Sequence, residues 1–87
     1  MATYIFVAEI TDHSENDFFY EGKYFRILSF FQKESFTAFD DEAAKKILLE
    51  CREKIAESYS YQSKQIYVGV VDILSKKNLH KIISVQS

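Results

Sequence analysis

Between residues 40 and 59, apolar residues recur at spacings of three and four, which is the pattern of an amphipathic helix. Asp40 is expected to cap this helix, because an aspartate side chain accepts hydrogen bonds from the unpaired N–H groups of the first turn. Asp41 and Glu42 follow in that turn, where the helix dipole favours negative charge. Polar residues from Ser58 onward mark the expected end. The apolar stripe consists of Ala44, Ile47, Leu48, Cys51, Ile55 and Tyr59.

Four segments rich in β-branched and aromatic residues predict strands, two before the helix and two after it. They are residues 3–10, 23–31, 65–74 and 79–85. The predicted fold is α+β, a four-stranded antiparallel sheet with one helix packed on one face, in the order β-β-α-β-β. At 87 residues, the chain is expected to form a single α+β domain over residues 1–87.

Gly69 lies in the middle of the third predicted strand. A glycine there indicates a β-bulge or a close approach of another group to the backbone. Residues 75–78 predict a tight turn, in which Asn78 is best suited to a left-handed backbone conformation.

The first three predicted strands are apolar at both alternating sets of positions. One helix covers only one face of a sheet, and soluble monomers rarely expose large apolar patches, so the second face needs another cover. Three covers remain open: the aromatic end of the connection at residues 11–22, a second copy of the chain, or a foreign protein. We expect a homodimer formed through a sheet face.

Net charge divides the chain into two parts. Residues 1–42 hold nine acidic and three basic residues, a net charge of −6, whereas residues 43–87 hold four acidic and eight basic residues, a net charge of +4. Such asymmetry is typical of two partner-facing surfaces, although uneven spacing by chance explains it equally well.

Composition favours a cytoplasmic location. A single cysteine excludes an internal disulfide framework. The first residues show no basic segment before an apolar one, which a secretory signal peptide needs. No apolar run reaches the length that spans a bilayer.

No catalytic arrangement stands out, and we expect a protein that is not an enzyme and needs no cofactor or metal. His13 lies among Asp12, Glu15 and Asp17, but this loop lacks the spacing of a calcium site, so a solvated loop is the favoured interpretation. Cys51 falls in the helix stripe, as a small buried residue does. With two glycines in the chain, no glycine-rich phosphate loop exists.

The favoured hypothesis is a non-catalytic protein–protein interaction module with a protein partner. An acidic segment with large aromatic side chains has the composition of an interface anchor. The candidate partner-binding residues are Asp12, Glu15, Asp17, Phe18, Phe19, Tyr20 and Glu21.

Two alternatives stay open. One is a nucleic-acid-binding domain that uses the basic C-terminal hairpin, with Lys76, Lys77, His80 and Lys81 as candidate contacts. The negative net charge of the chain weighs against it. The other is a small-molecule binder on an aromatic sheet face.

In length and predicted element order alone, the chain resembles very small β-β-α-β-β proteins of bacteria and their phages, including some anti-CRISPR inhibitors. The resemblance rests on no sequence motif and assigns no residue. It implies a stoichiometric inhibitor or adaptor as one form of the protein-binding hypothesis.

Overall fold

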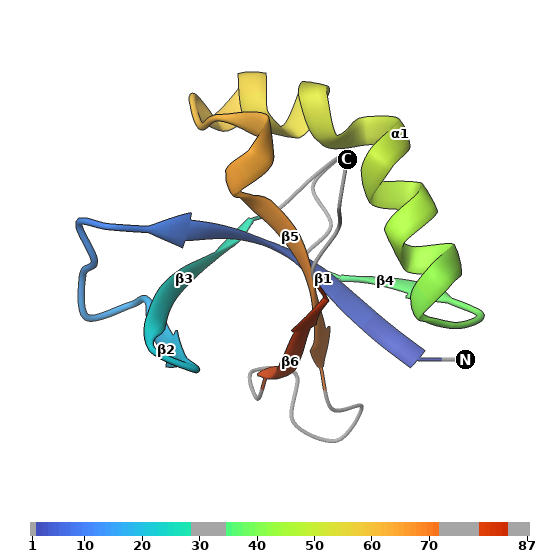
Figure 1. Cartoon of the computed structure of the whole chain (residues 1–87), viewed down its shortest axis with the longest axis horizontal. Helices are drawn as coiled ribbons and strands as arrows, with labels where there is room; N and C mark the ends of the chain where they lie inside the picture. The colour runs from blue at the N-terminus through green and yellow to red at the C-terminus, as the bar shows by residue number, and fades with distance from the viewer. Residues whose placement is uncertain (1, 29–34, 72–78, 84–87) are drawn as a thin grey trace.

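The computed structural model describes residues 2–28, 35–71 and 79–83, and it shows one helix packed against a curled antiparallel sheet (Figure 1). The fold is therefore α+β, as predicted. In chain order the elements are β1 (Ala2–Ile10), β2 (Phe18–Tyr20), β3 (Lys23–Leu28), β4 (Phe36–Ala38), α1 (Asp41–Tyr59), the 3₁₀ turn η1 (Ser63–Gln65), β5 (Ile66–Val71) and β6 (Leu79–Ile83).

β1 is the central strand of the sheet. The strand order is β2-β3-β1-β5-β6, and β4 pairs with β1 outside this path. Tyr4 pairs with Phe36 of β4 and also with Val70 of β5, while Phe6 pairs with Leu28 of β3. Because a strand has two edges, β3 and β4 lie end to end along one edge of β1 and β5 lies along the other.

The predicted order of four strands does not match this sheet, because β2 and β4 were not expected. β2 has three residues and follows a polar segment, so its pattern predicts the end of a loop. Residues 36–38 predict the approach to the helix, but these three residues form β4 and pair with the start of β1. The predicted strand ends at 29–31, 72–74 and 84–85 and the turn at 75–78 lie outside the described residues.

The helix matches its prediction at both ends, but its buried face differs in part: Ile47 of the predicted stripe is exposed, and Arg52 and Ala56 are buried. Asp40 has an extended backbone, and its side chain accepts a hydrogen bond from the N–H of Ala43 at 2.8 Å. The helix ends one residue after the predicted stop, at Tyr59, where Ser60 takes a left-handed conformation and donates its N–H to the carbonyls of Ala56 and Glu57. Local capping chemistry therefore sets both ends.

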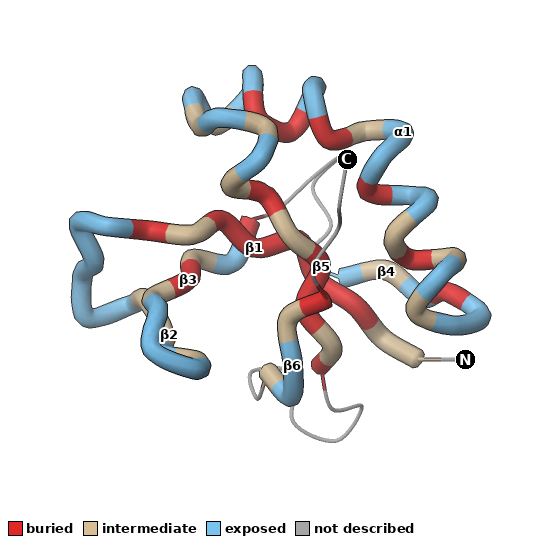
Figure 2. Tube along the Cα trace, in the orientation of Figure 1, coloured by how far each residue is buried: buried red, intermediate tan, exposed pale blue. Residues whose placement is uncertain are grey.

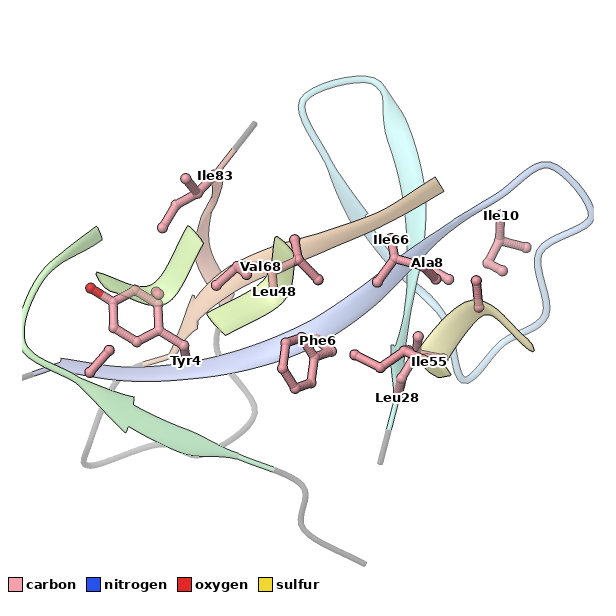
Figure 3. Packing of buried hydrophobic residues seen from close by; sticks show 13 residues of the cluster. Tyr4, Phe6, Ala8, Ile10, Leu28, Leu48, Ile55, Ile66, Val68 and Ile83 are labelled. Carbon is pink, nitrogen blue, oxygen red and sulfur yellow. The ribbon is translucent and has the colours of Figure 1, made fainter. Parts of the chain in front are cut away.

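The helix and one face of the sheet enclose the larger core. Alternate residues of β1 point into it (Figure 3). They meet the inner side of α1 and the matching positions of β5. The buried members of this cluster are Tyr4, Phe6, Ala8, Ile10, Leu28, Ala38, Ala44, Leu48, Ile55, Ala56, Ile66, Val68 and Ile83.

The second face of the sheet is covered by the chain itself. A second core cluster lies on this face. Its buried residues are Ile5, Val7, Phe25 and Val71, and around them pack Phe18, Tyr20, Tyr67, Leu79 and Ile82. β2 and β6 stand at opposite ends of the strand order, yet both contribute to this one cluster, so the sheet curls over its own second face (Figure 1). Val7 has no exposed surface at all.

Another part of the chain closely approaches the backbone at Gly69, as the sequence indicates. A Cβ at this position would collide with the side chain of Leu79. The pairing of β5 with β6 also shifts register next to it, between Val70 and Val71, as a β-bulge does.

We expect Gly69→Ala to lower the free energy of unfolding by about 1–3 kcal/mol, because the added methyl group overpacks the second cluster. Chemical denaturation followed by circular dichroism measures it. The loss of unfolding free energy caused by Gly69→Ala should be smaller in a Leu79→Ala background, because the side chain that the methyl group meets is then absent. An equal penalty in both backgrounds would contradict the proposed contact.

Candidate functional site

An ion pair with a buried carboxylate and a partly exposed arginine side chain fixes the loop before β2. The side chain of Asp17 has no exposed surface, and its two oxygens accept hydrogen bonds from Arg26 of β3. Arg26 Nε lies 2.8 Å from Oδ1 and Nη2 lies 2.9 Å from Oδ2, the parallel geometry of a bidentate arginine–carboxylate pair. The N–H of Ser14 donates to Oδ2 at 2.9 Å, and the N–H of Asp17 donates back to the Ser14 carbonyl at 3.1 Å.

Arg26 extends this network to the segment after the helix, because its Nη1 donates to the hydroxyl oxygen of Tyr61 at 2.9 Å. The hydrogen bonds from Arg26 hold the pKa of Asp17 below its ordinary value, and the hydrogen bond to Asp17 raises the pKa of Arg26. One ion pair therefore joins the loop, β3 and the end of the helical region.

A tight turn fixes the other end of β2. Glu21 and Gly22 both have positive φ, 47° and 86°, and they connect the paired residues Tyr20 and Lys23. Two positive φ values in a two-residue loop are the signature of a type I′ hairpin turn, which suits the twist of the strands. β2 is thus held by the ion pair on one side and by this turn on the other.

The three aromatic residues of β2 face different ways. Phe18 and Tyr20 pack against the second core cluster. Phe19 is 61% exposed, and its ring centroid lies 5.1 Å from that of Tyr24 across the hairpin. His13 stacks on Tyr24 with centroids 3.6 Å apart and planes nearly parallel. Phe19, Tyr24 and His13 therefore form one aromatic group.

Exposed carboxylates belong to the same loop and turn. Asp12, Glu15 and Glu21 are all exposed. The two cations of β3 are both engaged, Arg26 with Asp17 and Lys23 with Glu9 at 2.9 Å. We refer to Asp12, His13, Glu15, Phe19, Glu21 and Tyr24 together as the loop–hairpin surface.

The loop–hairpin surface lies at one end of the sheet, away from the residues that α1 covers. In Figure 2 the pale blue of exposed residues runs along the loop, and in β2 it alternates with the tan of intermediate residues. The predicted candidates therefore fall into two groups. Asp12, Glu15, Phe19 and Glu21 are exposed. Asp17 pairs with Arg26, and Phe18 and Tyr20 pack against the second core cluster.

The candidate nucleic-acid contacts are not assembled into a basic surface by the described residues. Lys81 donates to Asp41 Oδ2 at 2.7 Å, and the hydroxyl of buried Tyr4 donates to Oδ1 at 2.8 Å. These contacts hold β6 and β1 against the start of α1. Lys76 and Lys77 lie outside the described residues, and His80 is exposed.

The hydrogen bonds among Tyr4, Asp41 and Lys81 also shift the pKa values of these groups, and their role is structural. Burial, and then the hydrogen bond to Asp41, raises the pKa of Tyr4 to about 12. The hydrogen bonds from Lys81 and Tyr4 lower the pKa of Asp41. A tyrosine that keeps its proton so firmly is unsuited to act as a base near neutral pH.

Cys51 is half-buried, and its Sγ lies 3.0 Å from the carbonyl oxygen of Ile47. Burial raises the pKa of this thiol, the opposite of what a nucleophilic cysteine needs. Among the described residues, no three histidine, cysteine or acidic side chains are grouped to hold a metal ion.

Sequence reasoning missed the roles of Arg26, Tyr24 and Tyr61. One signal was available for Arg26, since it is the only charged residue between Tyr24 and Leu28. A charge inside an apolar strand needs a partner, and Asp17 is the acid next to the aromatic end of the preceding loop.

Comparisons with protein-family models, with curated proteins and with solved structures gave no match to this chain. In the described part of the chain, no helix has the length and apolar character needed to span a bilayer. The loop–hairpin surface must therefore be interpreted from its own chemistry.

We expect Asp17→Asn to lower the free energy of unfolding at neutral pH by about 1–3 kcal/mol, because hydrogen bonds to a charged partner are lost. The pKa of Asp17 is lowered on folding, so its stabilisation is present above the ordinary pKa near 3.8 and is lost as the pH falls through the folded value. Denaturation curves from pH 7 down to acid measure this.

The wild-type protein should lose stability below about pH 4, and both Asp17→Asn and Arg26→Met should reduce that loss. If Asp17→Asn keeps the full acid sensitivity of the wild type, the ion pair does not stabilise the fold as described.

Proposed function

We propose that this chain is a non-catalytic protein-binding module and that the loop–hairpin surface contacts its partner. The observation that carries the proposal is Phe19, a large aromatic ring that is mostly exposed on a strand fixed at both ends. Exposing such a ring to water is unfavourable, and aromatic anchors surrounded by polar groups are the usual centres of protein interfaces.

Preorganisation strengthens this interpretation. Ordering a flexible loop on binding costs free energy, so a loop that is already fixed binds with less loss. Here Asp17, which the sequence suggested as a direct partner contact, serves instead to hold the loop in place. The exposed carboxylates Asp12, Glu15 and Glu21 then provide a negative rim, which favours a partner with positive charge.

A stoichiometric inhibitor or adaptor of bacterial or phage type remains one form of this proposal. Its support from element order is smaller than the sequence suggested, because the sheet contains β2 and β4 besides the four expected strands. The support that remains is the small size of the domain.

The two alternatives receive less support. Nucleic-acid binding through the C-terminal hairpin would have one fewer cation available for phosphate groups, because Lys81 is paired with Asp41. A small-molecule site on an aromatic sheet face has to compete with the packing of the second cluster, where Phe25 is buried. We do not carry the homodimer through a sheet face into this proposal, because the curled sheet supplies the cover for which a second copy was expected.

Capture of binding proteins from an extract of the producing cells tests the proposal. We expect the immobilised wild-type chain to retain specific proteins and Phe19→Ser to lose them by about tenfold or more, as the loss of an interface anchor does. Leu49→Ser is the matched control, because Leu49 is also a large exposed apolar residue, 49% exposed, on the helix. Circular dichroism verifies that both variants fold.

A charge series gives the second comparison. Asp12→Ser with Glu15→Ser should weaken capture, whereas Glu53→Ser with Glu57→Ser, which removes two exposed carboxylates of α1, should leave it unchanged. If Phe19→Ser retains the same proteins as the wild-type chain, the proposal fails.

A further inference from the structure

β2 is an outermost strand of the sheet. The strand order places it at one end, beyond β3, in the part of the chain that the structure describes. It is short, three residues, and its middle residue is Phe19. An edge strand presents backbone N–H and C=O groups that can pair with another chain, and proteins normally protect such edges.

The hairpin register shows which backbone groups face outward. Tyr20 and Lys23 flank the two-residue turn, so they form the hydrogen-bonded pair that closes it. Pairs alternate along an antiparallel ladder, so the next pair, Phe19 with Tyr24, is not hydrogen-bonded. The N–H and C=O of Phe19 therefore point away from β3, to the outer edge, and no turn or loop hydrogen bond in the described residues uses them.

Both ends of this edge are already fixed. Asp17, the residue before β2, is tied to Arg26 and Ser14, and the residues after β2 form the type I′ turn. The strand therefore holds its extended conformation without a partner, which lowers the entropic cost of adding one.

Charge argues against a second copy of the chain as that partner. Pairing two β2 edges would bring together the exposed carboxylates of two loops and two turns, Asp12, Glu15 and Glu21 from each copy. The nearby cations do not offset them, because Lys23 and Arg26 are paired within the chain. Like charges at an edge are a common device against self-pairing. The same charges attract a basic chain.

We propose that the outer edge of β2 accepts an extended basic segment of a protein partner as an added strand. Phe19 exchanges backbone hydrogen bonds with one residue of that segment. Its ring packs against an apolar side chain, and lysine or arginine side chains meet Asp12, Glu15 and Glu21. This inference rests on the proposed function and specifies its binding mode and the chemistry of the partner.

The edge is short, so backbone pairing alone supplies few contacts. Phe19 and the carboxylates must provide most of the affinity, and because these charges are exposed, binding should weaken as salt is added. A single-stranded nucleic acid would be repelled by the same carboxylates.

A titration of the isotope-labelled full chain followed by NMR tests this mode. The probe is a short peptide that alternates lysine with valine, and the controls are the same peptide with glutamate for lysine, the same peptide with alternate backbone nitrogens methylated, and oligothymidylate. We expect saturable shifts at the amides of residues 18–20 with the first probe and slower hydrogen exchange at the Phe19 amide.

Methylation of the peptide backbone should weaken binding by about tenfold, since it removes the strand-pairing groups. Asp12→Asn with Glu15→Gln and Glu21→Gln should weaken it by about fivefold at low salt. The glutamate peptide and oligothymidylate should not bind. Glu53→Gln with Glu57→Gln is the matched control and should bind as the wild type does.

Equal binding of the methylated peptide, shifts that avoid residues 18–20, or binding of oligothymidylate in place of the basic peptide would each overturn strand addition. If protein capture nevertheless depends on Phe19, the proposed function stands and only this mode fails. If capture is insensitive to Phe19, both fail.

Discussion

β1 is buried on both faces, and the rest of the fold follows from that constraint. Tyr4, Phe6 and Ala8 point to one side and Ile5 and Val7 to the other, and all five are buried. A single helix satisfies only the first side. The second side is satisfied by curling the sheet, so that residues from β2, β3, β5 and β6 meet around Ile5 and Val7. Apolar burial on this scale is the main free energy available to a domain of this size.

The curl has a consequence for the surface. β2 is the end strand of the sheet, and the curl directs two of its aromatic residues inward, so that Phe19 between them faces outward by strand alternation. Asp17 and Arg26 then fix this end in place through a bidentate pair whose carboxylate is buried. The side chain of Arg26 stays 40% exposed, so the pair fixes the local geometry of this end without burying both charges. The loop–hairpin surface and the fold therefore depend on the same residues.

Much of the fold was predictable because it is encoded locally. The helix, its aspartate cap and the close approach at Gly69 each follow from residue type and spacing within a few positions. The need for a second cover was also visible, since apolar residues occupy both phases of the first strand. What periodicity could not supply is which segment provides that cover, because three-residue strands such as β2 and β4 have too few positions to show a pattern.

The candidate site was predictable only in part. The acids and aromatic residues of the loop make it a candidate, and Asp12, Glu15, Phe19 and Glu21 are each exposed. The role of Asp17 depends on Arg26, which is nine positions away in sequence, and on Tyr61, which is much farther. Such pairings arise from tertiary structure, so a sequence shows the charges but not their partners.

The fold described above requires that one chain covers both faces of its own sheet. Light scattering coupled to size-exclusion chromatography at micromolar concentration tests this directly. We expect a single species with the mass of one chain, 10.2 kDa. A stable species of twice that mass, unaffected by added salt, would contradict it, because it would show that an apolar face still needs a second copy as its cover.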